Sequence, residues 1–398
     1  MKNEINLITR FLGPDLLTYD PYDLWKTRLG LRLKKFYYEK GKATIPVIAP
    51  FYLLDAYAPL LVRRFIKPQE FPIVRAFAAL SSLNIYAITS EQKYIELAGV
   101  SVNWLIDNRL TDFHGACWGL GMPWMTKTGF SAASTPFISV VPYCVEALFE
   151  YSNHTGDKRS KEVALSTLDY LEKDLQRLLE APNNLALSYG PTKERRIVIN
   201  GNAYAMMLYA LLSDKLPTKR SLLIERASHI CNFIKSQQLP DGSWLYYADR
   251  EPGNFIDCFH SCFVLKNLIK FSEISGEDVS AIVDRGIEYV LNNFLDKKHG
   301  LARKFSITAH PTMVKFDLYD QAELLNLLIE TNKVEQAESL HNQIFKYFYI
   351  NAKGTFGYQI DLFGRLNEML YLRWAVMPMV YVLSKYYKNK KTEEDEPI

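Results

Sequence analysis

The chain has 398 residues, of which 48% are hydrophobic and 13% aromatic, so it can bury a large core. Its 47 Lys and Arg residues nearly balance 44 Asp and Glu residues, and the net charge is +3. No basic stripe interleaved with aromatic residues is present, which argues against a nucleic-acid partner. The five cysteines lie mostly within apolar runs, which indicates buried free thiols in a reducing cytoplasm.

Residues 1–45 are predicted to form a helical extension that packs on the rest of the chain. The first residues, MKNEINLITRFLGPDLL, carry acidic side chains early and no small-residue cleavage site, which is not typical of a signal peptide. Residues 20–42, DPYDLWKTRLGLRLKKFYYEKGK, are expected to supply a helix that closes an outer layer. The longest apolar run, residues 45–66, contains three prolines and Asp55, so we expect no transmembrane segment.

Residues 46–388 repeat one pattern with a period of about sixty residues. The most apolar helical runs end 65, 61, 59, 58 and 57 residues apart, at Tyr86, Tyr151, Leu212, Phe271, Ile329 and Tyr386. Each unit holds a helix that is apolar nearly all round, such as NAYAMMLYALL, and a helix with one charged face, such as KRSLLIERASHICNFIKSQ. Six buried helices alternating with six exposed helices predict an all-α, single-domain (α/α)6 toroid.

An open solenoid is the structural alternative to a closed ring. Its terminal units should carry a polar face, whereas the last unit here, LRWAVMPMVYVLSKYY, does not. Residues 389–398 follow that unit as a run of charges and are expected to form a disordered tail.

Polar residues gather at the starts of the predicted inner helices. Because the inner helices of such a ring run parallel, their N-terminal ends should surround one cavity. The residues are Asn200, Asn202 and Tyr204 in the third unit, Asp257 and His260 in the fourth, His310, Asp317, Tyr319, Asp320 and Gln321 in the fifth, and Tyr371, Arg373 and Trp374 in the sixth.

The catalytic candidates among them are His260, Asp257, Asp317, Tyr204 and Tyr319. In one hypothesis His260 moves a proton at a sugar carbon while Tyr204 or Tyr319 acts opposite it, as in an epimerase or lyase. In the other, Asp257 and Asp317 flank a glycosidic bond, as in a glycoside hydrolase. The structural alternatives are that Asp257 is a helix N-cap and His260 a hydrogen-bonded core residue.

Long loops between the units add aromatic residues to the same end of the predicted ring. Aromatic rings stack on the C–H faces of sugars, while amides, carboxylates and guanidinium groups bind sugar hydroxyls. Packing in the seams between helices is the alternative role for these rings. The predicted substrate-binding residues are Asn200, Asn202, Trp118, Trp124, Trp244, Tyr246, Asp320, Gln321, Arg373 and Trp374.

No metal or other cofactor is expected. Cys258, His260 and Cys262 lie close in sequence, but a helix turns about 100° per residue, so His260 points away from both cysteines. The sequence has neither a phosphate-binding glycine loop nor a nucleophile elbow.

The motifs QxxDGSW, FIDCFH, INGNAY and a later DxxxQ resemble a family of toroid proteins encoded among bacterial surface-polysaccharide biosynthesis enzymes. The resemblance covers most of the chain and places Asp257, His260, Asp317, Gln321 and Trp374 on its recurring positions. The run VINGNAYAMMLY, residues 198–209, is similar to an inner helix of glucuronyl C5-epimerases, and QQLPDGSW also has a counterpart there. QLPDGSW fits a motif of isoprenoid cyclases too, but their acidic DxDD and DDxxD motifs are missing.

Together these features predict a cytoplasmic enzyme that acts on a sugar during synthesis of bacterial O-antigen, capsule or exopolysaccharide. Its chemistry would be that of an epimerase, a lyase or a glycoside hydrolase, on a saccharide, a lipid-linked sugar or a nucleotide sugar. Peripheral association with polysaccharide assembly enzymes is expected. The alternatives are a non-catalytic toroid that binds a glycan or a partner and, third, an isoprenoid-cyclase-like enzyme.

Overall fold

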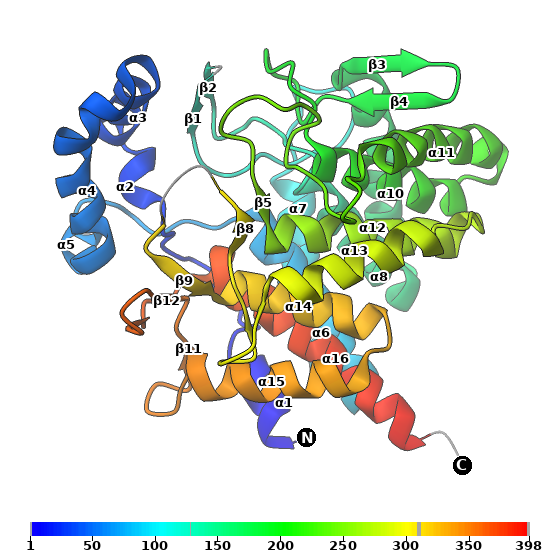
Figure 1. The fold of residues 1–398 in the computed structure, drawn as a ribbon. Coiled ribbons are helices and arrows are strands. Elements are labelled where there is room, and N and C mark those ends of the chain that lie inside the picture. The colour runs from blue at the N-terminus through cyan, green and yellow to red at the C-terminus, as the bar shows by residue number, and fades with distance from the viewer. Residues whose placement is uncertain (1, 128, 309–311, 396–398) are drawn as a thin grey trace.

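The computed structural model describes residues 2–127, 129–308 and 312–395, in which helices alternate between two layers of a ring (Figure 1). The inner helices are α6 (Pro72–Thr89), α8 (Val141–Thr155), α10 (Ile199–Lys215), α12 (Cys258–Ser275), α14 (Leu318–Glu330) and α16 (Met377–Asp395). The outer helices are α7 (Lys93–Asp107), α9 (Lys158–Asp169), α11 (Arg220–Gln237), α13 (Ser280–Asn293), α15 (Val334–Phe348) and α1 (Lys2–Thr9). The predicted all-α (α/α)6 toroid is confirmed.

The ring closes because the last inner helix, α16, packs between α14 and the first inner helix, α6. Phe77 of α6 stacks on Tyr381 of α16 with 5.2 Å between ring centroids. Asn84 of α6 donates a hydrogen bond of 3.1 Å to Ser384 of α16. These contacts exclude the open solenoid.

The two layers differ in burial as their sequences predict. In α10, 14 of 17 residues are buried, because Ala, Gly, Leu and Met on every side let neighbouring helices approach closely. In α11, 6 of 18 residues are buried, on the one face that packs against α10, and the charged face points outward.

The helix that completes the outer layer is not the one expected from residues 20–42. The short helix α1 packs on α16, with Leu7 and Ile8 buried. Residues 20–42 instead form α2 (Asp23–Lys26) and α3 (Arg28–Lys40), and α3 packs on strand β1 (Trp124–Thr126). Only Gly30 and Leu33 of the basic helix α3 are buried, which is too small an apolar face to cover a ring helix.

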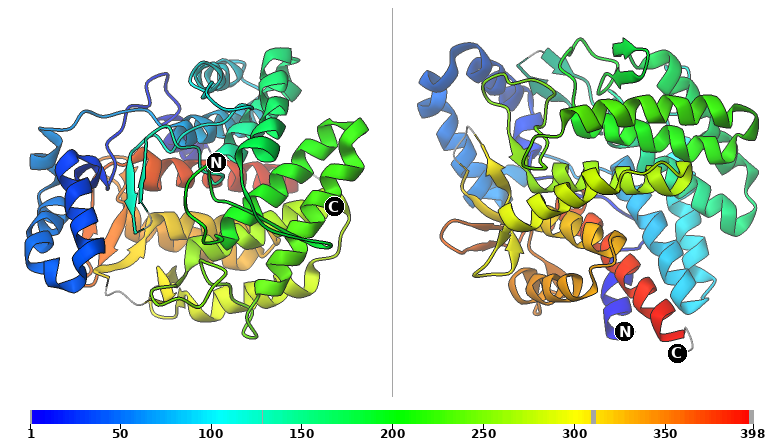
Figure 2. Two further views of the ribbon diagram at one scale, coloured as in Figure 1. Left: turned by 90° about the horizontal axis from the view of Figure 1, so that it is seen from above. Right: turned by 45° about the vertical axis from the view of Figure 1, so that its right-hand side comes forward.

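The N-terminal helices continue past residue 45. A turn, η1 (Gly41–Thr44), leads into α4 (Ile45–Tyr57) and α5 (Pro59–Arg63), and α2–α5 stand together at one side of the ring (Figures 1 and 2). At the other end of the chain, α16 continues to Asp395, so residues 389–395 are helical where a disordered tail was expected. Lys390 there pairs with Glu338 of α15 at 3.4 Å. Residues 396–398 lie outside the described residues.

Short antiparallel strands lie in the loops that precede the inner helices α8, α10, α12, α14 and α16. They are β1 with β2 (Gly129–Ser131), β3 (Arg177–Ala181) with β4 (Asn184–Leu187), β5 (Ile256–Asp257) with β8 (Phe305–Ile307), β6 (Leu295–Asp296) with β7 (Leu301–Ala302), β10 (Tyr349–Ile350) with β11 (Thr355–Phe356), and β9 (Val314–Asp317) with β12 (Gln359–Asp361) and β13 (Leu366–Asn367). Strand β5 ends at Asp257 and β9 at Asp317, each directly before an inner helix. A π-helix, η4 (Leu372–Val376), introduces α16 and presents Arg373 and Trp374.

Deeper in the ring, one buried and two partly buried ion pairs cross between inner helices. Lys266 of α12 pairs with Glu323 of α14, and these side chains are 7% and 2% exposed. Lys270 of α12 pairs with Glu146 of α8, although α10 lies between these helices in chain order. A third pair joins Lys385 of α16 to Glu330 of α14. The sequence pattern did not predict this polar centre.

Helix α6 is the one helix in the described part of the chain that is long and apolar enough to cross a membrane. In the structure 67% of that stretch is buried inside the ring, as expected for a core helix.

Candidate active site

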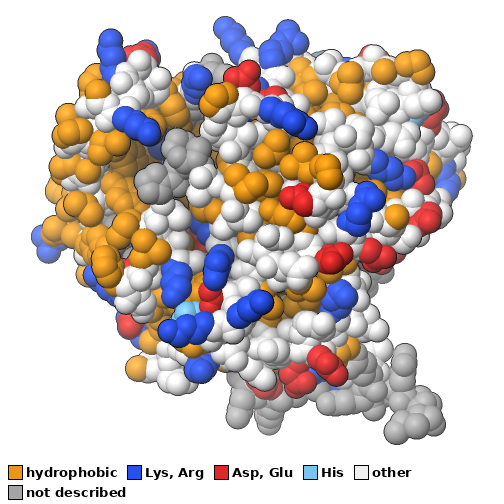
Figure 3. All heavy atoms as spheres, in the orientation of Figure 1, with side chains coloured by type: hydrophobic (Ala, Val, Ile, Leu, Met, Phe, Trp, Pro, Cys, Tyr) orange, Lys and Arg blue, Asp and Glu red, His pale blue; other side chains and the backbone are white. Residues whose placement is uncertain are grey.

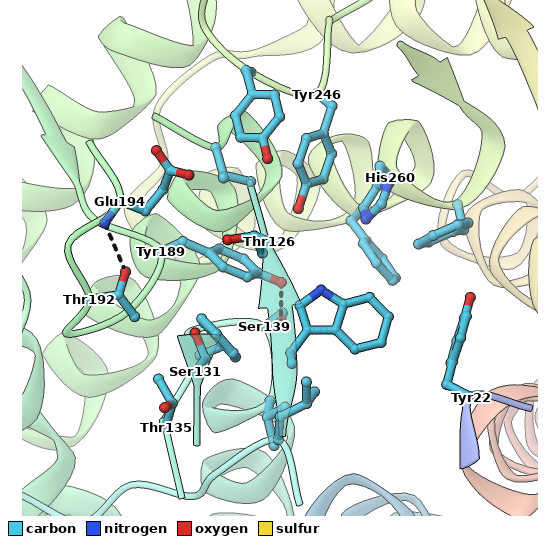
Figure 4. Close-up of a pocket in the computed structure, with 18 of the residues that line it drawn as sticks. Tyr22, Thr126, Ser131, Thr135, Ser139, Tyr189, Thr192, Glu194, Tyr246 and His260 are labelled. Carbon is cyan, nitrogen blue, oxygen red and sulfur yellow. Dashed lines mark hydrogen bonds between the residues drawn. The ribbon is translucent and has the colours of Figure 1, made fainter. Parts of the chain in front are cut away.

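A cavity of about 1270 Å³ lies at the N-terminal ends of the inner helices (Figure 4). Its walls are mostly aromatic rings and hydroxyl groups, the composition of a site that binds a polar ring compound. Of the residues predicted from sequence, those that line it are Tyr204, Asp257, His260, Tyr319, Trp124, Tyr246, Arg373 and Trp374.

Asp257 and His260 form a hydrogen-bonded pair in the cavity wall. Asp257 occupies the N-cap position of α12, but its side chain makes no capping bond. Both of its carboxylate oxygens lie instead 2.8 Å from Nδ1 of His260. A carboxylate only accepts hydrogen bonds, so Nδ1 donates, and Nε2 of the neutral ring keeps its lone pair.

Aromatic neighbours hold the His260 ring in place. Its centroid lies 4.0 Å from that of Phe259 and 4.7 Å from that of Tyr246. The His260 side chain is 19% exposed, whereas that of Asp257 is 3% exposed. Among the residues that the structure describes, none bonds to Nε2, which leaves this atom able to reach a bound molecule.

Three tyrosines around His260 act as proton-holding groups at neutral pH. Burial raises the pKa of Tyr204, Tyr246 and Tyr319 well above the usual value for a phenol. Tyr204 shares a 3.1 Å hydrogen bond with Tyr143 at the cavity floor. Such groups donate hydrogen bonds to an oxygen atom rather than accept a proton from carbon.

Asp317 does not line the cavity and is fully buried. Its oxygens accept hydrogen bonds from the backbone N–H of Tyr319 at 3.0 Å, Lys304 Nζ at 3.0 Å, Gln359 Nε2 at 2.9 Å and Trp374 Nε1 at 3.0 Å. These bonds occupy both oxygens, so Asp317 cannot reach a substrate, contrary to the predicted catalytic role. It positions Lys304 and Trp374, which do line the cavity.

Three cationic residues line the cavity, namely Lys193, Lys304 and Arg373. Burial alone would lower the pKa of Lys304, but Asp317 and Asp320 raise it above its usual range, so this lysine stays charged. Arg373 pairs with Asp20, a buried residue of the N-terminal segment. Nη2 of Arg373 is buried and has no hydrogen-bond partner within the described ranges. The wall can therefore bind negative charge on a substrate or an intermediate.

The amides of Asn202 and Gln321 have structural roles instead of the predicted contact with substrate. Asn202 accepts from the backbone of Leu187 at 2.8 Å and donates to the carbonyls of Leu187 and Val198 at 3.1 and 3.0 Å. Gln321 bonds both backbone groups of Ala302 in the same manner, at 2.7 and 2.8 Å. Asn202 thus ties the start of α10 to β4, and Gln321 ties the start of α14 to β7.

Trp118 and Trp244 do not line the cavity, contrary to their predicted role. Trp118 is fully buried and donates to the carbonyl of Leu105 at 2.8 Å. Trp244 is 4% exposed and donates to the carbonyl of Ile234 at 3.0 Å. Both rings fill seams between the helical layers, which is the alternative role that the sequence analysis gave for them.

Asn200 and Asp320 are buried behind the wall, also contrary to a direct contact with substrate. The side-chain amide of Asn200 has no hydrogen-bond partner among the described residues. Burial raises the pKa of Asp320 well above its usual range, and its Oδ1 accepts from the backbone of Phe259 at 3.1 Å.

His310 lies outside the described residues. Within the described ranges, no three His, Cys, Asp or Glu side chains are grouped so that they could hold a metal.

Several cavity residues were not predicted from sequence. Tyr22, from the segment before α2, stands edge-on to Trp124 and Trp374, with 5.3 Å between centroids in each pair. On another side, Tyr189 donates to Ser139 at 2.7 Å, and the loop that carries Glu194 follows it (Figure 4). The signal available for this loop was its position, because it precedes an inner helix just as the tryptophan-bearing loops do.

Comparison with known proteins gives the fold a context. No protein-family model matches the sequence, and no curated protein matches it. Among solved structures, cellobiose 2-epimerase from Bacillus thermoamylovorans has a TM-score of 0.64 at 11% identity, covering 81% of this chain and 88% of that one. Cellobiose 2-epimerase from Spirochaeta thermophila has 0.62 at 13%, covering 83% and 89%. The GH76 α-mannanase from Bacteroides thetaiotaomicron has 0.58 at 10%, covering 82% and 88%.

These neighbours are sugar-processing (α/α)6 enzymes. They include both epimerases and a hydrolase, so the shared fold does not select a reaction. That choice depends on the groups in the cavity.

Proposed function

We propose that this protein is an enzyme that transfers a proton at a carbon of a saccharide, with Nε2 of His260 as the base. The observation that carries the proposal is the orientation of His260, whose Nδ1 is held by both oxygens of Asp257 while Nε2 is open to the cavity. A histidine fixed in one tautomer, with its other nitrogen at a large cavity, is the arrangement of a general base.

The carboxylates of the cavity favour this chemistry over glycoside hydrolysis. Most glycosidases need two carboxyl groups on either side of the scissile bond. Among the described residues that line the cavity, the carboxylates are Asp257 and Glu194. Asp257 has both oxygens on His260, and Oε1 of Glu194 accepts from the backbone of Arg196 at 2.9 Å. Because Asp257 is engaged by His260, these residues do not supply two carboxylates to flank a sugar linkage.

The remaining groups suit a reaction through an enolate. Nε2 of His260 takes the proton from a carbon next to a carbonyl. The electron pair of the broken C–H bond forms the C=C bond of the enolate, and the π pair of the carbonyl moves onto its oxygen. Lys304, Arg373 and the tyrosine hydroxyls can stabilise that oxygen. Delivery of a proton to the opposite face by a tyrosine hydroxyl gives an epimer. Transfer of the abstracted proton to the former carbonyl carbon, with loss of the proton of the adjacent hydroxyl and protonation of the enolate oxygen, gives an isomer. Expulsion of a leaving group from the next carbon gives an unsaturated sugar.

The proposed setting is surface-polysaccharide synthesis in the bacterial cytoplasm, with a saccharide, a lipid-linked sugar or a nucleotide sugar as substrate. The resemblance of QxxDGSW, FIDCFH and INGNAY to toroid proteins of biosynthesis clusters supports this setting.

The test is solvent-proton exchange, followed by NMR in D2O with a panel of reducing disaccharides, uronic acids and nucleotide sugars. The proposal expects deuterium at a single sugar carbon with wild-type protein and none with His260→Gln, because Gln cannot take up a proton near neutral pH. New reducing ends without deuterium would indicate hydrolysis and contradict the proposal. Saturable binding without exchange across the panel would indicate a glycan-binding protein.

A matched control is available in the same chain. Asp296 and His299 have the same three-residue spacing and a 2.6 Å contact with Nδ1, but neither lines the cavity. The variant His299→Gln therefore removes an equivalent hydrogen bond away from the site, and exchange should persist in it.

A further inference from the structure

The N-terminal helices α4 and α5 expose a large apolar surface. We call it the α4–α5 face, and its members are Ile45, Val47, Tyr52, Leu53, Leu54, Tyr57, Leu60, Leu61 and Phe65, which are 38% to 89% exposed. Figure 3 shows hydrophobic side chains gathered over these helices, with Lys and Arg side chains at the edge. Contiguous apolar surface of this kind marks an interaction site.

Helix α4 is the least covered part of this face. It has 13 residues, and its only charged side chain is Asp55. Of its residues whose burial the structure describes, none is buried, although the helix is apolar on every side. At about 1.5 Å per residue it spans about 20 Å, which is shorter than the roughly 30 Å needed to cross a bilayer. A helix of this length can lie in a membrane interface but cannot span the membrane.

The surroundings of the face are strongly basic. Residues 28–67 contain nine Lys and Arg residues and two acidic residues, a net charge of +7 in a chain whose total is +3. The exposed basic side chains are Arg28, Arg32, Lys35, Lys40, Lys42, Arg64 and Lys67. Aromatic side chains stand among them, with Phe36 41% and Tyr38 40% exposed. Apolar side chains ringed by cations and aromatic rings complement a surface of anionic lipid headgroups.

The α4–α5 face is linked to the cavity wall through helix α3, which packs on α4 and on β1. Helix α3 packs on β1, and Nζ of Lys34 lies 3.4 Å from the ring centroid of Trp124, a cavity residue. Tyr22, directly before α2, lines the cavity as well. The helices that carry the face are therefore continuous with one wall of the site.

We propose that the α4–α5 face binds an anionic membrane surface, with α4 and α5 in the headgroup region and the cavity held beside it. If the proposed function holds, the substrate class is a lipid-linked sugar in the membrane, whose saccharide enters the cavity. A second copy of this chain fits the face less well, because two faces with a net charge of +7 each would repel one another.

The test is co-sedimentation of the full chain with vesicles of phosphatidylethanolamine and phosphatidylglycerol, beside vesicles of phosphatidylcholine alone. Binding to the anionic vesicles is expected to exceed binding to the neutral ones and to weaken as salt screens the headgroup charge. The double variant Leu60→Glu/Phe65→Glu should lower the partition coefficient by about tenfold or more, since both side chains lie on the face. Leu60 and Phe65 are 68% and 89% exposed, so the fold does not depend on them.

The control variant is Leu222→Glu on the outer helix α11, where the leucine is 49% exposed and distant from the face. It should bind vesicles as the wild type does. The proposal is overturned if the wild-type chain ignores anionic vesicles, or if the double variant binds them as well as wild type. It is also overturned if the double variant only converts a dimer to a monomer by light scattering. Deuterium exchange into a soluble saccharide should be equal in all three proteins, and its absence from all of them would count against the proposed function while leaving the vesicle result intact.

Discussion

Replacing Asp257 by Asn isolates the part that the carboxylate plays in the site. Because both carboxylate oxygens of Asp257 lie 2.8 Å from Nδ1 of His260 and can only accept, Nδ1 carries the proton and donates it. An Asn side chain has nearly the same shape, but its NH2 group can donate to Nδ1 and so place the ring proton on Nε2. The base would then have no lone pair toward the substrate. We expect kcat for deuterium exchange to fall by about a thousandfold, or about 4 kcal/mol in activation free energy, with KM nearly unchanged.

This loss must be separated from a loss of folding. Asp257 is 3% exposed, and a charge-assisted hydrogen bond contributes about 1.5–3 kcal/mol, so a lower melting temperature is expected as well. Asp296→Asn, at the equivalent pair outside the cavity, should lower the melting temperature and spare kcat. Because Asp257 acts through His260, adding Asp257→Asn to His260→Gln should cause little further loss. A kcat for Asp257→Asn within a factor of about three of wild type would refute the reasoning.

Three further predictions concern the fold. Lys266→Met should lower the free energy of unfolding in urea by about 3–5 kcal/mol, because it leaves Glu323 charged and buried, and Lys266→Met/Glu323→Leu should recover most of that loss. Partial burial, followed by the charge of Asp23, raises the pKa of Asp55 to about 7 from an ordinary 3.8, so the folded chain holds a proton that the unfolded chain releases. Stability should therefore fall as pH rises from about 4 to 7, and Asp55→Asn should flatten that slope in thermal unfolding. Asn202→Leu should cost about 1–3 kcal/mol per buried backbone group that it leaves unpaired and should leave KM unchanged.

The sequence predicted the ring because a helix that is buried on all sides needs apolar residues on all sides, and this pattern is visible in the sequence. The run NAYAMMLYALL is apolar on every side, and in the structure α10 is buried on every side. The ion pair Lys266–Glu323, which is buried, and the ion pair Lys270–Glu146, which is partly buried, left no such signal. A lysine eight residues into an apolar helix has its partner on another helix, and only the closed ring brings the two together.

The site was harder to predict because residues that line the cavity and residues that pack in the core are of the same types and occur in the same loops. Trp124 lines the cavity and Trp118 fills a seam, although they lie only six positions apart in one glycine-rich loop. Likewise, Asp257 and Asp317 each end a strand directly before an inner helix. Asp257 lines the cavity and binds His260, whereas Asp317 lies behind the wall and binds Lys304 and Trp374. Neighbours from distant segments decide these roles.

The central claim is that Nε2 of His260 reaches the reacting carbon of a saccharide in the cavity. The most direct measurement is a crystal structure of His260→Gln with the saccharide that exchanges deuterium with the wild-type protein. Superposed on the wild-type site, the exchanging carbon should lie about 3–3.5 Å from Nε2, with an adjacent oxygen facing Lys304 or Arg373. A saccharide bound outside the cavity, or one whose exchanging carbon is turned away from residue 260, would contradict the account.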